Sequence, residues 1–320
     1  MKIRLGYVAI SLTLDEIDHY QTITWTRLQN LEKSEQEEKL SKIIHHNLDF
    51  LEKILKYNIQ NEIFFYRLSH NMIPLATYPG YSYDFVTSYK NKWKKIGSFI
   101  KKNHIRVDIH PNQFCVLNST NPVVVEQTIE ELKVCNQIYK SLGISGKVIL
   151  HVGSSMPNKE EAMKQFKTVF GQLEEDIKSM ILLENDDKVY TAEDVLGLCE
   201  ELKIPMVLDY HHYLCNHGNE KIEKLLPQIF ETWKGEKLPP KVHFSSPKSR
   251  KERRSHSTYL SYRGFLKFLK VISPYGNEVD VMLECKGKDE ALFRLVRQLK
   301  IDSQYQFLNA STLIIKENRN

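Results

Sequence analysis

The sequence lacks any apolar run that approaches the roughly 20 residues of a membrane-spanning helix, so no membrane association is expected. Its first residues show no sustained apolar stretch and no small-residue cleavage site, and no signal peptide is predicted. Cysteine is scarce: the 320 residues contain five, widely spaced, and none forms a Cys-x-x-Cys pair. This pattern excludes a zinc ribbon or a dithiol redox motif and is typical of reduced thiols in a cytosolic protein.

A glycine-rich phosphate loop is also missing, because only Gly6 lies near the first predicted strand, and this argues against a doubly wound dinucleotide-binding sheet. Short β-branched and apolar runs alternate instead with segments of helical spacing. The predicted strands are 3–9, 63–68, 105–110, 147–151, 180–184, 205–210, 241–245 and 279–284. The main predicted helices are 37–57, 91–103, 122–142, 159–178, 192–202, 222–233, 259–272 and 289–300. Eight such units predict an α/β fold, a single (β/α)8 TIM-type barrel over residues 1–300, with a tail at 301–320 of unassigned role.

Charge is mild overall but unevenly distributed. Lys+Arg number 45 against 40 Asp+Glu, a net charge of +5. The segment 90–106 holds seven basic residues and no acidic one, and the segment 241–254 holds six basic residues against Glu252 alone. Such segregation suits a surface that binds phosphates, although a solvated helix face explains the first segment equally well.

Side chains that bind metals stand at the predicted strand ends. Catalytic groups of a barrel lie at the carboxyl ends of its strands, and every strand from the third to the eighth ends in such a residue. These residues are His110, His151, Glu184, Asp209 with His212, His243 and Glu284. Imidazoles and carboxylates without a thiolate favour Zn²⁺, Mn²⁺ or Fe²⁺ over Ca²⁺, and such a cluster can hydrolyse a phosphodiester. Glu184 and Glu284 could bridge neighbouring cations, whereas His211 is expected to point away from the site.

Four short motifs connect these residues to a known family. They are His-Pro-Asn-Gln-Phe at 110–114, Leu-Glu-Asn-Asp-Asp at 183–187, Leu-Asp-Tyr-His-His at 208–212 and Lys-Val-His-Phe-Ser-Ser-Pro-Lys at 241–248. In this order they resemble the UV damage endonucleases, microbial DNA-repair enzymes whose metal-dependent barrel is related to the endonuclease-IV-type apurinic-site nucleases. The resemblance extends from Arg4 to Glu284, nearly the whole chain.

The resemblance implies a centre of up to three divalent cations, most often Mn²⁺, with Zn²⁺ and Mg²⁺ as alternatives. Its implied ligands are His110, His151, Glu184, Asp209, His212, His243, His256 and Glu284. Lys241 matches a carboxylated lysine near the metals, and the implied catalytic residues are Glu184, Glu284 and Lys241. From the sequence alone, Lys241 is a strand residue on the same face as His243.

The resemblance also implies contacts with damaged DNA. Gln113 and Phe114 match a pair inserted into DNA at the lesion, with Phe114 where Tyr is common, and Tyr7 matches an aromatic residue after the first strand. Phe114 could equally be a loop residue packed on the barrel rim. Lys248, Arg250, Arg253 and Arg254 are expected to contact phosphates.

The expected function is a cytosolic endonuclease that cuts double-stranded DNA directly 5′ to cyclobutane dimers and 6-4 photoproducts, leaving a 3′-hydroxyl and a 5′-phosphate. No protein partner is inferred. Three alternatives stay open: an apurinic-site endonuclease on the same scaffold, a metal-dependent sugar isomerase or epimerase, and a lesion-binding protein without catalysis. A sugar enzyme needs no basic face, and a pure binding protein has no use for the full ligand set.

Overall fold

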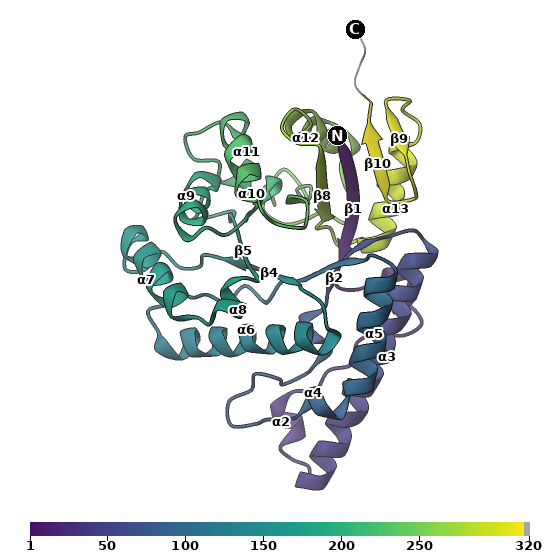
Figure 1. The fold of residues 1–320 in the computed structure, drawn as a ribbon, viewed down its shortest axis with the longest axis vertical. Coiled ribbons are helices and arrows are strands. Elements are labelled where there is room, and N and C mark those ends of the chain that lie inside the picture. The colour runs from purple at the N-terminus through teal and green to yellow at the C-terminus, as the bar shows by residue number, and fades with distance from the viewer. Residues whose placement is uncertain (317–320) are drawn as a thin grey trace.

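The computed structural model describes residues 1–316 and has the predicted barrel (Figure 1). Eight parallel strands form a closed ring, because the first strand pairs with both the second and the eighth. The strands are β1 (Lys2–Val8), β2 (Phe65–Leu68), β3 (Arg106–Ile109), β4 (Lys147–His151), β5 (Ile181–Glu184), β6 (Met206–Asp209), β7 (Lys241–Phe244) and β8 (Glu278–Leu283). All eight lie where the hydrophobic pattern predicted them.

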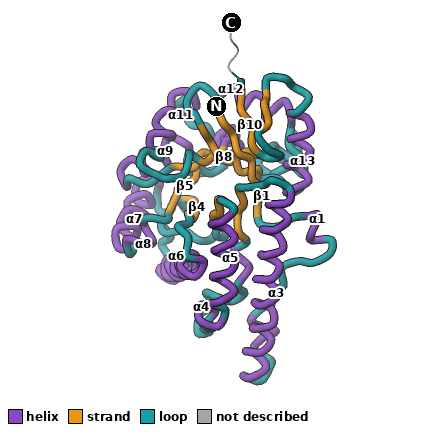
Figure 2. The backbone as a smooth tube through the Cα atoms, turned by 45° about the vertical axis from the view of Figure 1, so that its right-hand side comes forward, coloured by secondary structure: helices purple, strands orange, loops and turns teal. Residues whose placement is uncertain are grey.

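Helices follow each strand and surround the ring. The longer helices are α3 (Lys33–Gln60), α5 (Lys90–Lys102), α6 (Pro122–Leu142), α7 (Lys159–Gln172), α9 (Ala192–Leu202), α11 (Ile222–Glu231), α12 (Tyr262–Ile272) and α13 (Lys288–Leu299). Short ones lie in the connections: α1 (Leu12–Asp15), α2 (Trp25–Leu28), η1 (His70–Met72), α4 (Phe85–Ser88), α8 (Glu175–Lys178) and α10 (Tyr210–Cys215). Figure 2 shows the helices outside the strands, with one end of α3 protruding beyond the rest of the molecule. None of the helices in residues 1–316 combines the length and apolarity that a membrane crossing needs.

One predicted helix is in fact two. The segment 159–178 is two helices, because Leu173 adopts an extended backbone between α7 and α8. Leu173 and Ile177 are both buried, so the apolar spacing continues across the break and hides it from a periodicity argument.

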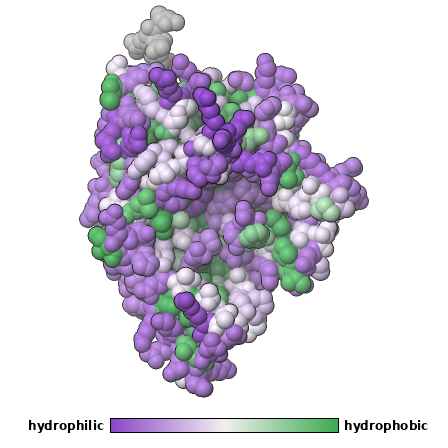
Figure 3. All heavy atoms as spheres, turned by 180° about the vertical axis from the view of Figure 1, so that it is seen from behind, coloured by the Kyte–Doolittle hydropathy of each residue, from purple (hydrophilic) through white to green (hydrophobic). Residues whose placement is uncertain are grey.

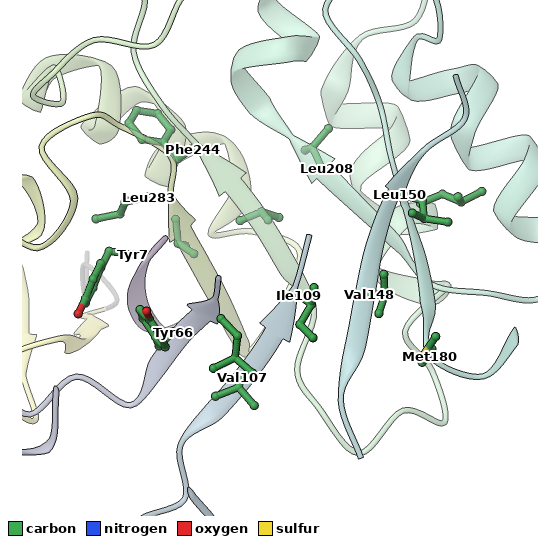
Figure 4. Close-up of a cluster of buried hydrophobic side chains, with 14 of the residues drawn as sticks. Tyr7, Tyr66, Val107, Ile109, Val148, Leu150, Met180, Leu208, Phe244 and Leu283 are labelled. Carbon is green, nitrogen blue, oxygen red and sulfur yellow. The ribbon is translucent and has the colours of Figure 1, made fainter. Parts of the chain in front are cut away.

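The outer faces of the strands carry the main apolar core. Val107 and Ile109 of β3 and Val148 and Leu150 of β4 belong to it (Figure 4). Apolar side chains of the surrounding helices complete it. The residues that alternate with them along the strands point into the barrel. This period of two decides which side chains reach the functional site.

The barrel interior is divided into an apolar and a charged part. Ile149, Leu182 and Val207 form a separate apolar cluster, which Trp233 joins. The remaining interior holds buried ions, an uncommon filling for a barrel whose centre usually contains branched apolar residues. Arg4 and Arg106 both bind Asp280 there.

The segment 301–316 contains a hairpin that adds to the sheet. Its strands are β9 (Tyr305–Phe307) and β10 (Thr312–Ile315), and β10 runs antiparallel to the first half of β1. Only the second half of β1 pairs with β2, so β10 occupies the edge that the stagger of the barrel leaves open. Leu313 is fully buried in this position. The last four residues of the predicted tail lie outside the described part of the chain.

Candidate metal centre and nucleic-acid interface

The carboxyl ends of the strands bring together six of the predicted metal ligands. They form two groups, within each of which one ligand atom per residue lies within 4.8 Å of the others. The first group is His110, His151 and Glu184, and the second is Glu184, Asp209, His243 and Glu284. Glu184 belongs to both, which fits the prediction that it bridges neighbouring cations.

Glu184 directs its two oxygens to different imidazoles. Its Oε2 lies 3.0 Å from His110 Nε2, and its Oε1 lies 2.7 Å from His243 Nδ1. His243 Nδ1 is also 3.1 Å from Glu284 Oε1. Burial would raise the pKa of Glu184, but the imidazoles of His243, His151 and His110 outweigh burial and hold this pKa well below its usual value. Glu184 is therefore an ionised carboxylate, as a bridging ligand must be.

The loop after β5 fixes the next strand end. Asn185 is fully buried, accepts a hydrogen bond from the Asp209 backbone N–H at 2.9 Å and donates one to the Asp209 carbonyl at 3.0 Å. The Asp209 side chain in turn caps α10 by accepting from the His212 backbone N–H at 2.7 Å. The motif residues at 185, 209 and 212 thus hold one another in place at the rim of the barrel.

His212 lies beside the two groups but outside them. Its Nδ1 is 2.9 Å from the Asn185 carbonyl and 3.6 Å from Glu184 Oε1, which leaves Nε2 facing elsewhere. Burial would lower the pKa of His212, but the charges of Asp209 and Glu184 raise it to about 9. His256 is also outside both groups and half-buried, with its ring 6.0 Å from that of His212.

The donor set fits divalent cations. Asp209 Oδ2 and His151 Nδ1 are buried, and neither has a hydrogen-bond partner among residues 1–316. Native proteins rarely leave a buried polar atom unsatisfied, and such atoms often mark the place of an ion or water. Burial lowers the pKa of His151 and of His243, which favours the neutral form in which imidazole binds metals.

His211 is not the strand residue that we predicted. It is buried within α10, and its Nε2 lies 3.4 Å from the Arg254 carbonyl. The helix begins at Tyr210, one residue after the strand, so strand alternation no longer governs where His211 points. Its position connects the rim of the barrel to the loop that carries the predicted phosphate contacts.

Sequence reasoning missed a buried ionic network directly beneath the ligands. Arg67 binds Asp108, Glu284 and His243, and Asp108 also binds Lys241. Lys241 is fully buried, and burial lowers its pKa to about 7 although Asp108 acts in the opposite direction. Asp108 and Lys241 each stand two positions before a predicted ligand, His110 and His243, and this spacing is the signal that period-two alternation offered.

Tyr7 is a correction to the predicted lesion contacts. It is fully buried, and its hydroxyl donates a hydrogen bond of 2.6 Å to Asn58 Oδ1 of α3. Tyr7 therefore packs between β1 and α3 and offers no surface to DNA. Ser11, in the following loop, is also buried, and its hydroxyl donates to Asp289 Oδ2 at 2.7 Å.

Gln113 and Phe114 are exposed on the loop after β3. The Phe114 side chain is 74% exposed, so it is not packed on the barrel rim as the alternative interpretation required. The loop itself is firmly held: the fully buried Asn118 accepts from the Ser154 N–H at 3.0 Å and donates to the Ser154 carbonyl at 2.6 Å. Phe114 is thus an exposed aromatic ring on a rigid support, four residues after His110.

The basic loop, residues 247–256, projects from the rim after β7. Pro247 pairs with His256 at its base, and Lys248, Arg250, Arg253 and Arg254 are exposed along it. Arg254 lies 3.5 Å from Asp187, which ties the loop to the motif after β5. The predicted phosphate-binding residues therefore share one exposed loop near His212.

The other basic segment, 90–106, does not form a single face. Lys92 binds Asp49 and Lys95 binds Glu52, so these two charges pair with α3. Arg106 is only 5% exposed and binds Asp280 inside the barrel. The inclusion of Arg106 in a phosphate-binding surface is wrong, because the strand turns its side chain inward.

Comparisons with known proteins concern the whole chain. Residues 3–312 match the family model described as UV-endonuclease UvdE. The UV DNA damage endonuclease of Bacillus cereus (strain 03BB102) is 39% identical over 315 residues, which cover 98% of this chain and 99% of that protein. The crystal structure of SacUVDE has a TM-score of 0.84 and 34% sequence identity, with 93% of this chain and 98% of that chain covered.

A more distant likeness concerns the fold alone. Endonuclease IV from Thermus thermophilus has a TM-score of 0.54 at 14% identity, with 93% of this chain and 98% of that chain covered. The near-complete coverage at 39% identity, together with the family match over residues 3–312, is the evidence for membership. The chain belongs to the UV-endonuclease UvdE family.

Proposed function

We propose that this protein is a metal-dependent endonuclease that cuts double-stranded DNA directly 5′ to ultraviolet photoproducts, both cyclobutane dimers and 6-4 products, leaving a 3′-hydroxyl and a 5′-phosphate. The observation that carries the proposal is the pair of ligand groups that share Glu184, with the exposed Phe114 on the neighbouring loop. Membership of a family whose curated relatives are UV DNA damage endonucleases supports it. We also propose a cytosolic location, because the enzyme needs access to the chromosome.

Up to three cations, most naturally Mn²⁺, would be held by the eight predicted ligands: His110, His151, Glu184, Asp209, His212, His243, His256 and Glu284. When bound, such ions supply an activated water and neutralise charge that develops on the phosphate. Glu184 and Glu284 hold negative charge at the centre, and His110 and His151 provide imidazole nitrogens beside it. His212 and His256 are proposed to complete the shell from the rim, where their rings lie next to each other.

Lys241 is proposed to act from below the centre. Because burial lowers its pKa to about 7, a substantial fraction of the amine is unprotonated near neutral pH. An unprotonated amine can react with carbon dioxide to form a carbamate, the carboxylated form that the family resemblance implies. Intact-protein mass spectrometry under native conditions, compared with a Lys241→Arg variant, tests this modification.

DNA recognition is proposed to rest on exposed groups around the centre. Figure 3 shows a hollow with hydrophilic walls on one face of the molecule, a surface that suits a charged polymer. The basic loop would bind the backbone, because its arginines and Lys248 are exposed. A photoproduct weakens stacking and pairing, so its extrusion costs less than that of normal bases. Phe114 would stack in the resulting gap, and Gln113 would hydrogen-bond the bases left without partners.

The test uses three supercoiled plasmids: irradiated, depurinated and untreated. In Mn²⁺ the protein should nick the irradiated plasmid, and the ends should accept a polymerase directly because they carry a 3′-hydroxyl. Chelator-treated protein is the control. Nicking of the depurinated plasmid alone would favour the apurinic-site alternative, and an absence of nicking in all three would overturn the proposal.

A further inference from the structure

The cluster beneath the second ligand group centres on Arg67 of β2. Its side chain is 7% exposed and points into the barrel. Nε donates to Asp108 Oδ1 at 3.1 Å, Nη1 donates to Glu284 Oε1 at 2.5 Å, and Nη2 lies 2.8 Å from His243 Nε2. One guanidinium therefore contacts two of the four members of that group.

We propose that Arg67 is a positioning residue that arranges Glu284 and His243 as ligands of the second cation group before any cation enters. This inference rests on the proposed metal centre and adds to it a residue that binds no metal and no DNA. A guanidinium is planar and carries only donors, so its three contacts fix the direction of each acceptor.

The contact with His243 determines which ring nitrogen faces the site. Because Arg67 can only donate, His243 Nε2 must accept, and Nδ1 is then the nitrogen presented to the carboxylates. Nδ1 lies 2.7 Å from Glu184 Oε1 and 3.1 Å from Glu284 Oε1, and it is the atom that a cation would bind in place of the proton. Without Arg67, the ring could turn over and present the other nitrogen.

Arg67 is itself held from the opposite side. Asp108 accepts from Arg67 through Oδ1 and from the unmodified Lys241 amine through Oδ2, so one carboxylate connects the two side chains. Asp108 is 1% exposed and Lys241 is fully buried, which leaves little room for either to move. The orientation of Glu284 and His243 is thus set by a rigid chain of contacts that extends across the barrel from β7 through β3 to β2.

The charge of Arg67 has a second effect. Glu184, Asp209 and Glu284 lie within a few ångströms of one another and repel. A buried cation beside them reduces this repulsion when the site is empty. The positive charge of Arg67 by itself would repel a divalent cation, so a role through charge alone predicts tighter metal binding when Arg67 is replaced. A positioning role predicts weaker binding. This opposition makes the inference testable.

The experiment titrates Mn²⁺ into chelator-treated protein and follows free Mn²⁺ by electron paramagnetic resonance. For Arg67→Met we expect the affinity of one class of sites to fall about 10- to 100-fold, the usual effect of removing a group that orients a ligand. Arg67→Lys retains the charge but carries its donors on a single nitrogen instead of a planar fork, so it cannot reproduce the arrangement of the three contacts and its affinity should fall as well. Its melting temperature without metal should lie closer to wild type than that of Arg67→Met.

Arg106→Met is the matched control. Arg106 is an equally buried arginine of the barrel interior, but it binds Asp280 and the Pro239 carbonyl rather than any predicted ligand. Its loss should lower the melting temperature and leave Mn²⁺ affinity unchanged.

Unchanged or tighter Mn²⁺ binding by Arg67→Met would overturn the inference, because it would show that Arg67 contributes charge only. If Arg67→Met fails to fold, the Mn²⁺ affinity of Arg67→Lys is compared with that of wild type. An unchanged affinity in Arg67→Lys would also overturn the inference. A wild-type protein that binds no Mn²⁺ would overturn the proposed metal centre and this inference together.

Discussion

At the scale of single residues, Glu184 is the proposed ligand that belongs to both groups. We predict that Glu184→Ala lowers cleavage at least about 100-fold, more than the loss of an outer contact typically costs. The fold should be retained, and the stabilisation by Mn²⁺, about 2.7 kcal/mol at a hundredfold excess over Kd, should largely disappear. Plasmid nicking and melting curves with and without Mn²⁺ measure the two effects. Glu284→Ala should behave similarly.

Glu236→Ala is a suitable control for this substitution. Glu236 pairs with Lys147 at the first residue of β4, at the opposite end of the strands from the ligands. The Glu236→Ala protein should be somewhat less stable than wild type but should be stabilised by Mn²⁺ to the same extent. Glu184→Ala activity within a few-fold of wild type would refute the ligand assignment.

Phe114 and Gln113 carry the prediction on lesion selection. Stacking of a base on an aromatic ring contributes about 1–3 kcal/mol, so Phe114→Ala should weaken binding to irradiated DNA by roughly 5- to 150-fold. The double variant with Gln113→Ala should lose more, with Mn²⁺ content and affinity for undamaged DNA unchanged. Gel-shift titrations on irradiated and untreated duplexes measure the difference.

Ile301→Ala provides the comparison, because Ile301 is 87% exposed just after α13 and lies outside the loop that carries Gln113 and Phe114. This substitution should change neither the affinity for irradiated DNA nor the affinity for untreated DNA. A double variant of Gln113 and Phe114 that still distinguishes irradiated from untreated DNA would place lesion selection elsewhere.

The six residues of the two candidate ligand groups could be predicted from the sequence because each stands at the end of a recognisable strand, whereas His256 was named only through the family resemblance. Alternation along β3 also places Arg106 and Asp108 on the same inward face as His110, but a buried charge runs against the expectation for a barrel interior. The network of Arg67, Asp108 and Lys241 connects three strands that are distant in sequence. Only the closed ring shows that these charges neutralise one another.

At the scale of elements, the basic loop is predicted to bind the DNA backbone. Each phosphate contact that is removed lowers the slope of log affinity against log salt by about one unit. Arg250→Ala combined with Arg253→Ala should therefore weaken binding to irradiated and untreated DNA alike and reduce that slope by about two. Affinity measured at several salt concentrations gives the slope.

Lys101→Ala with Lys102→Ala is the control for the loop. Both lysines are exposed in the last turn of α5, shortly before β3 begins, and therefore at the amino end of the barrel. This variant removes the same charge and should leave the slope unchanged. If the slope of log affinity against log salt were unchanged in the loop variant, the loop would not contact DNA phosphates.

The pairing of α3 with α5 gives a prediction on pH. Glu52 is 8% exposed and lies 2.7 Å from Lys56 and 2.9 Å from Lys95. Burial would raise the pKa of Glu52, but hydrogen bonds from Lys56 and Lys95 outweigh it and lower the pKa. Because the folded pKa lies below the unfolded one, the stabilisation is present above the unfolded value and disappears as pH falls through the folded value.

Glu52→Gln should therefore reduce the free energy of unfolding by about 0.5–1 kcal/mol at pH 7 and by much less near pH 3. Urea denaturation of both proteins at the two pH values measures this. An equal loss at both pH values would show that the effect comes from packing rather than charge.

Element boundaries were harder to predict than element positions. The start of α12 at Tyr262 rather than Tyr259 depends on Ser261, whose hydroxyl accepts from the Gly264 N–H at 3.1 Å. The pairing of β10 with β1 could not be predicted. The tail contains a single short apolar run, Leu313–Ile315, and the partner strand β1 lies about 300 residues earlier in the chain. Long-range pairing of this kind leaves no local pattern.

At the scale of the whole molecule, the C-terminal hairpin contributes to the stability of the barrel. Leu313 is fully buried against β1, whereas Leu308 in the same hairpin is 51% exposed. We predict that Leu313→Ala lowers the free energy of unfolding by about 2–4 kcal/mol, as for other buried leucines. Leu308→Ala should change it by less than about 0.5 kcal/mol. Chemical denaturation of both variants measures these changes. Small and equal losses in the free energy of unfolding would show that the hairpin does not stabilise the barrel.

The position of β10 also has a consequence for biosynthesis. β1 is translated long before both of its neighbours in the first half of the strand, β8 and β10. A nascent chain must therefore keep β1 without these partners until translation has passed β10. The ring that brings Glu284 toward Glu184 cannot close before β8 has been made, so a shorter polypeptide lacks the two assembled ligand groups. A nuclease built in this way cannot act until β8 has been translated and has paired with β1.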